Sequence, residues 1–478
     1  MFEEFEEIKE NTYLMLGDTP VMLINVDDSV YEELEPSLVP FALRGTIKKY
    51  VPRNAETKEE IEKELSRKNK ITDFNKESFT NYLADRILHI SKSNYKKIVN
   101  TLGYSQKQNP KVRAGIAVSC HAASMSDNYW LKPVNSDLQW KDVDLKNNSL
   151  SEAITLVALH GKSVTIQGRP HTGELTNLGT TATGWRREAG ETYLYKKNVQ
   201  GGHNAATEIN VSNILDCFNV PHAIYEHAED EYDKNMCKCK NLCTKELNMV
   251  DATDVMLYGK RKYGDEYKYI LDIDKENIYK MCIIDYLISN SDRHSGNWGF
   301  YMSSKTGNLL CCHPLFDHNY AFDREDMIAV DGGPSKVFDG KSKKEVAEFA
   351  IKNCNLKCIA PVKRDMFYNK EEYESFMSRA VELGLYRKIK PTFLQKIGLK
   401  DFEKYVPVIV EPNEKVDYNK YYKQLYEKDK KKNSRQSTII DANSDIARKA
   451  VEIATNKINR TSQSVAENVS SRKIKPII

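Results

Sequence analysis

The sequence predicts an α+β fold with two lobes, a strand-rich lobe followed by a helical one, behind an N-terminal α/β region. From about residue 154 to residue 270, short strand-like stretches alternate with turn residues. From about residue 275 to residue 409, apolar residues recur at helical spacing. A strand-rich part that precedes a helix-rich part is typical of two lobes with a cleft between them.

Length and composition set the expected boundaries. A chain of 478 residues is too long for one compact core. The expected parts are an N-terminal α/β region (1–152), a strand-rich lobe (153–270), a helical lobe (271–411) and a basic, partly disordered tail (412–478). Within the tail, residues 418–437 carry seven Lys or Arg against two Asp or Glu, 7 − 2 = +5.

The N-terminal region carries signals of both strands and helices. A hairpin with a Gly-Asp turn is expected from Tyr13 to about Asp28. An exposed charged helix should follow over residues 54–70, and two more helices should start at Ser78 and Ser91. Trp130 and Trp140 are expected in the core or on a docking surface, and the region shows no catalytic constellation of its own.

The bulk composition favours a cytoplasmic globular protein. The formal net charge is only +3, so no nucleic-acid partner is evident. The first residues are acidic and lack the apolar core of a signal peptide, so none is expected, and no apolar run is long enough to span a membrane. Three of the ten cysteines lie close together, Cys237, Cys239 and Cys243. Buried strand thiols are favoured over zinc, since a fourth ligand and a CxxC spacing are missing.

The segment "NSDRHSGNWGF" after an apolar helix is the strongest functional signal. Asp292 and Asn297 are five positions apart, the spacing of a kinase catalytic loop, whose Asp accepts the substrate proton and whose Asn binds Mg²⁺. A hairpin with its turn at 305–308 would bring Asp317 back beside Asn297, and such oxygen ligands suit Mg²⁺. The alternative is that these are ordinary turn residues.

An upstream Lys and Glu fit the same site. The strand "ETYLYKKNV" carries Lys196, with Lys197 on its other face, and Glu208 opens the next helical segment. Glu208 shares the helix edge of an apolar stripe, and a buried carboxylate there needs a cationic partner. That stripe consists of Val211, Ile214, Leu215 and Phe218. The alternative is an edge lysine and a first-turn glutamate that the helix dipole favours.

Two weaker signals complete the candidate site. The Gly- and Thr-rich stretch before the Lys196 strand could cradle phosphate through its backbone N–H groups, although an ordinary β-turn fits nearly as well. This stretch comprises Gly179, Thr180, Thr181, Ala182 and Thr183. His294 and His313 could be imagined with Asp292 as metal ligands of a hydrolase, but no third partner at a suitable spacing is clear.

"SNSDRHSGNWGF" followed by "PLFDHNYAF" resembles the C-terminal signature of HipA-like serine/threonine kinases, over about residues 153–409. The resemblance implies a bilobal protein-kinase-like fold that uses ATP and Mg²⁺. It implies that Asp292 is the catalytic base and that Asn297 and Asp317 bind the metal. The other residues that it implies to be ATP-binding are Gly179 to Thr183, Lys196, Glu208, the hinge Lys240, Asn241 and Leu242, His294 and Phe316.

The resemblance leaves several points open. The phosphate loop lacks the Ser-rich, Lys-containing form of the toxin members of the family, although Thr180, Thr181 and Thr183 could be self-phosphorylated. A protein with a Ser or Thr acceptor is the expected substrate, and an antitoxin-like partner is left open. The D-R-H-x-x-N core also resembles phosphoinositide kinases, with the basic tail as the only hint of a membrane surface. A nucleotide-binding pseudokinase or scaffold is a further alternative.

Overall fold

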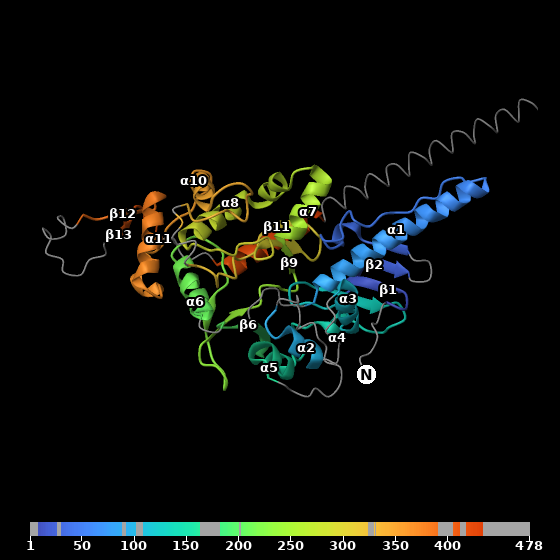
Figure 1. Ribbon diagram of the computed structural model, residues 1–478, viewed down its shortest axis with the longest axis horizontal. Helices are drawn as coiled ribbons and strands as arrows, with labels where there is room; N and C mark the ends of the chain where they lie inside the picture. Colours follow the sequence, from blue (N-terminus) through green and yellow to red (C-terminus); the bar gives the residue numbers. More distant parts are fainter. Residues whose placement is uncertain are drawn as a thin grey trace, which may run out of the picture. The chain divides into compact units, whose positions relative to one another are not determined.

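The computed structural model describes most of the chain. The described residues are 8–25, 30–87, 92–101, 109–162, 182–199, 202–323, 329, 331–390, 405–411 and 417–433. The chain divides into two compact units, residues 1–421 and 422–478. The strands and helices with bounds given below all lie in the first unit (Figure 1). The expected basic tail is described only over 417–433, where residues 418–433 are helical.

The N-terminal region is built on a four-stranded antiparallel sheet of order β3-β2-β1-β4. Its strands are β1 (Thr12–Leu16), β2 (Thr19–Asn25), β3 (Val30–Glu33) and β4 (Tyr129–Pro133). The predicted hairpin is therefore confirmed, with Gly17 in the left-handed conformation at its turn. Trp130 and Trp140 are both buried, as expected of core residues, and their ring centroids lie 6.4 Å apart.

One long helix replaces two predicted ones in this region. The described N-terminal helices are η1 (Pro36–Leu38), α1 (Lys58–Asp85), α2 (Tyr95–Thr101), α3 (Pro110–Ser119) and α4 (Trp140–Val143). The prediction of a new helix at Ser78 was wrong, because Ser78 lies inside α1. No Gly or Pro interrupts residues 58–85, and α1 instead begins at a capping box formed by Thr57 and Glu60.

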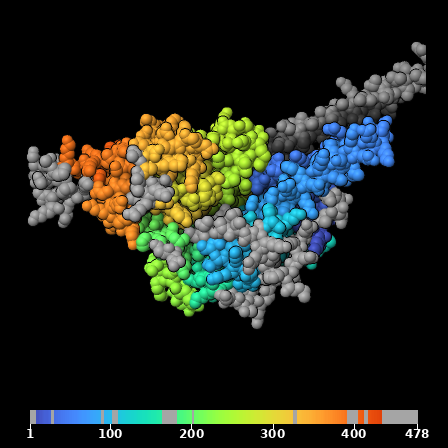
Figure 2. All heavy atoms as spheres, in the orientation of Figure 1, coloured from blue at the N-terminus to red at the C-terminus, as the bar shows by residue number. Residues whose placement is uncertain are grey.

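The strand-rich part forms a second four-stranded antiparallel sheet, of order β5-β6-β8-β7. Its elements are α5 (Glu152–His160), β5 (Thr183–Glu188), β6 (Glu191–Lys197), α6 (Asn204–Leu215), β7 (Tyr225–Ala228) and β8 (Met236–Lys240). Helix α6 packs on β6, β7 and β8, and α5 packs on β5 and β6. In the space-filling view, the blue to cyan surface of the N-terminal region lies against the green surface of this part (Figure 2).

Helices α5 and α7 lie in a range, residues 154–270, where mainly short strands and one helical segment at Glu208 were expected. Helix α5 is capped by Ser151 and ends at Gly161 in the left-handed conformation. A short apolar run such as "AITLVAL" has no periodicity that separates a strand from a buried helix. Helix α7 (Ala252–Tyr263) packs on α8.

A three-stranded sheet of order β11-β10-β9 lies at the start of the helical part. Its strands are β9 (Leu247–Asp251), β10 (Gly299–Ser303) and β11 (Leu309–Cys312), and helix α8 (Glu266–Leu287) precedes β10. The predicted hairpin after the "NSDRHSGNWGF" segment is confirmed, since β10 and β11 pair antiparallel across residues 304–308. Helix α8 bends at Asp274, whose carboxylate accepts the N–H of Cys312 at 2.9 Å and ties the helix to β11.

The remaining described elements belong to the helical part. They are α10 (Lys343–Ala350), η3 (Arg364–Met366), α11 (Lys370–Glu382), β12 (Tyr386–Lys388) and β13 (Tyr405–Pro407). Both α10 and α11 pack on α8, and both match predicted helical stretches. The main hydrophobic core is continuous from β1 in the N-terminal region to α11. Among the described residues, no helix is long and apolar enough to cross a membrane.

Candidate active site

Lys196 lies near the end of β6, an interior strand, between Thr183 on β5 and Cys237 on β8. Its side chain is 7% exposed. Neighbouring residues of a strand face opposite sides of the sheet, and Lys197 accordingly faces away and pairs with Asp233 at 3.4 Å. The two lysines therefore lie in different environments, and only Lys196 is buried.

Glu208 on α6 is the buried partner of Lys196. One carboxylate oxygen contacts the Lys196 ammonium, and the other accepts the backbone N–H of His318 at 2.9 Å. Helix α6 begins at Asn204, four residues earlier than predicted, so Glu208 lies beyond the first turn. A dipole effect confined to the first turn cannot account for this carboxylate, which is stabilised instead by these two partners.

Asp317 is the second carboxylate on Lys196, with Oδ1 2.7 Å from Nζ. It follows β11, and its backbone φ is 58°, in the left-handed region that Asp tolerates more readily than most residues. The β10–β11 hairpin thus returns the chain to the Lys196–Glu208 pair. One lysine from β6 joins a carboxylate from α6 and a carboxylate that follows β11.

The charge states of this cluster follow from burial and pairing. Burial alone would lower the pKa of Lys196, but the carboxylates of Asp317 and Glu208 outweigh it and hold this pKa well above its usual value. Burial favours a raised pKa of Asp317, yet the Lys196 ammonium lowers it overall. Burial raises the pKa of Glu208, and Lys196 offsets only part of the effect. Lys196 and Asp317 are therefore both charged at neutral pH.

A buried ion pair attaches the loop after α8 to that helix. Arg293 is 2% exposed, and its guanidinium contacts the Asp285 carboxylate of α8 at 3.1 Å. Asn290 also donates its side-chain N–H to Asp285, at 2.9 Å. A buried charge pair of this kind requires good geometry and further hydrogen bonds to offset desolvation, and the loop supplies both.

Arg293 also joins the two halves of the candidate site. Its Nη1 donates to the carbonyl of Asn297 at 2.7 Å and to the carbonyl of Phe316 at 2.8 Å. Phe316 directly precedes Asp317, so one guanidinium fixes the end of the loop beside the residue that contacts Lys196. The structure thereby brings together the predicted loop and the predicted returning Asp.

Asp292 and Asn297 face each other across this loop. The Asn297 amide Nδ2 donates to the Asp292 carbonyl at 2.8 Å and lies 3.4 Å from Asp292 Oδ2. Asn297 is 2% exposed, whereas the Asp292 side chain is 31% exposed. Lys336 approaches the Asp292 carboxylate at 3.7 Å. The carboxylate is thus oriented by its own loop while remaining open to a ligand.

His294 has a local structural contact. Its Nδ1 accepts the backbone N–H of Gly296 at 3.1 Å, and its Nε2 lies 3.9 Å from Asp292. His313 is only 2% exposed, and its Nδ1 donates to the Pro314 carbonyl at 2.9 Å. An exposed His and a core His do not form a hydrolytic metal site. Within the described ranges, no group of three or more His, Cys, Asp or Glu side chains could hold a metal ion.

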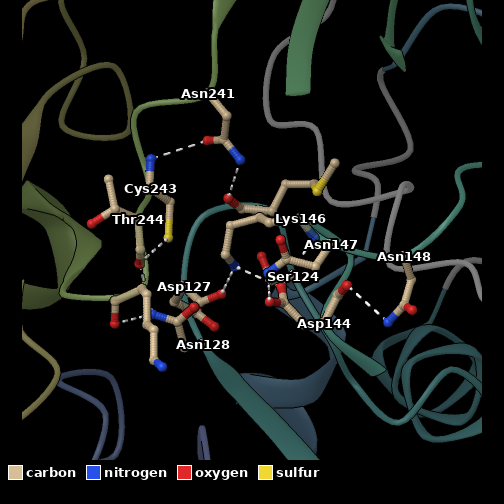
Figure 3. A network of polar contacts seen from close by, with 12 residues as sticks. Ser124, Asp127, Asn128, Asp144, Lys146, Asn147, Asn148, Asn241, Cys243 and Thr244 are labelled. Atoms are coloured by element: carbon tan, nitrogen blue, oxygen red, sulfur yellow. Dashed lines mark hydrogen bonds and ion pairs between the residues drawn. The ribbon is translucent and has the colours of Figure 1, made fainter. Parts of the chain in front are cut away.

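The predicted hinge connects β8 to β9 and is bonded to the N-terminal region. Asn241 donates its side-chain N–H to the Met125 carbonyl at 3.1 Å, and Asn128 donates to the Thr244 carbonyl at 2.9 Å. Figure 3 shows Asn241, Asn128 and Thr244 together with Asp127 and Lys146. The Lys146 ammonium donates to the Asp127 carbonyl at 3.0 Å. The N-terminal region therefore determines the path of the hinge.

An apolar cluster lies beside this hinge. Leu242 and Phe316 both pack against it. Its buried members are Ala205, Ala223, Tyr225, Cys237 and Cys239. The first two of the three closely spaced cysteines thus contribute to an apolar wall, and Cys243 is buried as well. A flat aromatic base could lie against such a wall, while Lys240, the first predicted hinge residue, is the exposed end of β8.

The predicted phosphate loop is described only at its end. Gly179, Thr180 and Thr181 lie outside the described residues. Ala182 accepts the backbone N–H of Lys197 at 3.1 Å. Thr183 is 3% exposed, and its hydroxyl accepts a hydrogen bond from Lys92 at 2.5 Å.

The sequence analysis missed two residues that shape the site, Asp285 and Arg293. A signal was present, because Asp285 interrupts the apolar run "MCIIDYLI", where an unpaired carboxylate would be costly. The Arg of "SDRHSGN" is the first cation that follows Asp285 in the sequence. Lys92 carried no comparable signal, since it contacts a residue 91 positions away.

No protein-family model matches this chain, and no curated protein matches it. Among solved structures, the chain is similar to the Helicobacter pylori proinflammatory kinase CtkA, with 14% identity, 43% of this chain and 88% of that chain covered, and a TM-score of 0.31. It is also similar to HipA of the Shewanella oneidensis toxin–antitoxin system, in complex with HipB and operator DNA. There the identity is 10%, 78% of this chain and 95% of that chain are covered, and the TM-score is 0.41. Overlaps of this extent do not assign a function.

Proposed function

We propose that the protein is an ATP- and Mg²⁺-dependent phosphotransferase that transfers the γ-phosphoryl group of ATP to a Ser or Thr hydroxyl of a protein. One observation supports this most strongly: Lys196 contacts both Glu208 on the adjacent helix and Asp317 after the hairpin. A strand Lys paired with a helix Glu, beside an Asp at the metal position, is the arrangement on which protein kinases depend.

The residues present fit a magnesium ion. Asn297 donates its Nδ2 to the Asp292 carbonyl, which leaves its amide oxygen as the ligand atom, and Asp317 supplies a carboxylate. Oxygen ligands of this type suit Mg²⁺, which also takes oxygens from nucleotide phosphates. When bound, the ion supplies charge neutralisation to the phosphates. Lys196 would hold the same phosphates from β6, with Glu208 orienting its ammonium.

Asp292 would act on the acceptor. Its partly exposed carboxylate can accept a hydrogen bond from a substrate hydroxyl, orient the hydroxyl oxygen toward the γ-phosphorus and take its proton as the bond to phosphorus forms. Asn297 positions Asp292 through the loop. Leu242 and Phe316 would contact the adenine from the apolar side, and the hinge backbone would bind its polar edge.

The test is phosphoryl transfer by the full-length protein. Wild type, Asp292→Asn and the exposed control Asp365→Asn would be incubated with γ-labelled ATP and Mg²⁺, alone and with dephosphorylated casein. We expect label on protein with wild type and the control, and a loss of roughly 100-fold or more with Asp292→Asn, the usual contribution of such a group. Transfer by Asp292→Asn at the wild-type rate would remove Asp292 from this role.

Two further arms separate the other candidates. Vesicles containing phosphatidylinositol test a lipid acceptor, and label on lipid instead of protein would identify a lipid kinase. Mg²⁺-dependent ATP binding without transfer to any acceptor would favour a nucleotide-binding scaffold. An antitoxin-like partner is a separate hypothesis, tested by co-purification with the product of a neighbouring gene.

A further inference from the structure

A second buried lysine reaches the candidate site from the N-terminal region. Lys92 is 3% exposed, and its ammonium donates to the Thr183 hydroxyl at 2.5 Å. Thr183 is the register partner of Lys196 across β5 and β6. Lys92 is therefore one strand away from the lysine at the centre of the site, at the point where the predicted phosphate loop joins β5.

Hydrogen bonds hold the backbone that follows Lys92. The Lys92 carbonyl accepts the N–H of Tyr95 at the start of α2. Asn94 donates to the Ala158 carbonyl at 3.1 Å, and Lys97 donates to the Gly161 carbonyl at 2.9 Å. These two bonds attach the segment to α5, which in turn packs on β5 and β6 (Figure 1). The ammonium is thus positioned by packed helices.

The electrostatic surroundings of Lys92 are those of the candidate site itself. Two charged groups of the candidate site act on Lys92, namely Asp317 and Lys196, and Lys196 in turn contacts Glu208. Burial lowers the pKa of Lys92 to about 7, Asp317 acts to raise it and Lys196 to lower it. Conversely, Lys92 helps to lower the pKa of Asp317. The three side chains belong to one charge cluster.

We propose that Lys92 is a second phosphate-binding lysine of the nucleotide site, supplied by the N-terminal region. The inference rests on the proposed function, because it takes the ligand to be ATP. Lys196 contacts Asp317, and Lys92 acts on the same carboxylate electrostatically. Two ammonium groups suit a polyphosphate with its metal ion, because the polyphosphate carries more negative charge than one carboxylate. The N-terminal region would then be a part of the catalytic unit that contacts substrate.

A purely structural role of Lys92 predicts a different result. If Lys92 only docks the N-terminal region, replacing its ammonium by an apolar side chain removes the donor to Thr183 and should lower the free energy of unfolding, and any loss of binding should be the same for every ligand. If it binds phosphate, the loss should depend on how many phosphates the ligand carries. The chain length of the nucleotide therefore discriminates between the two roles.

The experiment measures equilibrium binding of ATP, ADP, AMP and adenosine, with Mg²⁺, to the full-length protein. The variants are Lys92→Met, Lys92→Arg and, as a matched control, Lys96→Met at an exposed position of α2. We expect Lys92→Met to weaken ATP and ADP binding by roughly 10- to 100-fold, the range for a charged hydrogen bond. AMP and adenosine should bind as to wild type, Lys92→Arg should recover part of the loss, and Lys96→Met should resemble wild type.

The outcomes separate this inference from the proposed function. Wild type that binds none of the nucleotides would overturn the proposed function, and the inference with it. The inference alone would be overturned if wild type binds ATP and Lys92→Met binds ATP with unchanged affinity. It would also be overturned if Lys92→Met loses the same affinity for all four ligands. Thermal unfolding of every variant shows whether it folds. If Lys92→Met does not fold, the binding measurements are made with Lys92→Gln.

Discussion

Arg293 binds the Asp285 carboxylate on α8 and donates to the carbonyls of Asn297 and Phe316, on the two sides of the candidate site. At the scale of residues, the site depends on such buried charges. Each is paired, because an uncompensated charge in the interior is far more costly than a missing contact. The sequence allowed the Lys196–Glu208 pair to be predicted from spacing, whereas the Arg293–Asp285 pair went unpredicted.

Removing one partner of the Arg293–Asp285 pair should lower the free energy of unfolding more than removing both partners. Asp285→Asn leaves the Arg293 guanidinium buried without its counter-charge, and we expect the free energy of unfolding to fall by about 3 to 5 kcal/mol. The double variant Asp285→Leu with Arg293→Met should recover about half of that stability. It should still transfer no phosphoryl group, because the loop has lost its link to the Asn297 and Phe316 carbonyls.

Urea unfolding and the transfer assay measure the two effects on the same samples. A double variant less stable than Asp285→Asn would show that the pair contributes net stability. A stable double variant with full transfer would show that Arg293 does not position the loop.

His313 should make stability depend on pH. Burial lowers its pKa to about 4, while an unfolded chain binds the same proton near pH 6.5. Between these values the unfolded state holds more protons, so the free energy of unfolding falls as pH falls, by about 2 kcal/mol at pH 5 from this group. His313→Gln should therefore lose about that much less stability than wild type between pH 7 and pH 5, measured by urea unfolding. Parallel pH curves would contradict the assignment.

At the scale of elements, the β10–β11 hairpin decides where Asp317 lies, and its turn rests on the N-terminal region. Gly307 has a φ of 72°. A Cβ at this glycine would lie 1.7 Å from the carbonyl oxygen of Ser37 in η1. Arg44 also donates to the Gly307 carbonyl, at 3.4 Å. Only glycine permits both this conformation and this approach.

Substitution at two glycines separates backbone strain from docking. Gly340 has a similar φ of 74°, but a Cβ there would meet nothing within 4 Å. We expect Gly340→Ala to lower the free energy of unfolding by about 1 kcal/mol from the left-handed backbone alone. Gly307→Ala should lower it by about 3 kcal/mol or more, since the clash adds to the same strain. Equal losses in urea unfolding would mean that the turn is not held against η1.

The elements also show where sequence patterns were sufficient. The hairpins, β6, α10 and α11 were predicted because turn residues, alternation and caps are local signals. The start at Ser78 was wrong because a possible cap does not end a helix that has no Gly or Pro. The strand texture expected of residues 154–160 was wrong because a short apolar run carries no usable period. Residues 252–263 are helical too, and the helix ends at Gly264 in the left-handed conformation, a stop signal that the prediction did not use.

At the scale of the whole molecule, the N-terminal region is part of the same core as the helical part. The predicted division placed it apart, because its links to the rest are long-range: Asn128 to Thr244, Lys92 to Thr183 and Met125 to Asn241. Local periodicity says nothing about contacts between residues 90 to 120 positions apart. The positions of residues within one motif could be predicted from their spacing, whereas the long-range hydrogen bonds that hold the motif in place could not.

The hinge network has a mechanical consequence. The segment 125–128 bonds to Asn241 on one side of the connection and to Asn248 and Met249 on the other, the last through a Ser126 carbonyl at 2.8 Å. A connection bonded on both sides cannot widen until those bonds break. For a nucleotide bound as proposed, the rate of product release would then be controlled by residues that touch neither the product nor the metal, so turnover and affinity could be changed independently of each other.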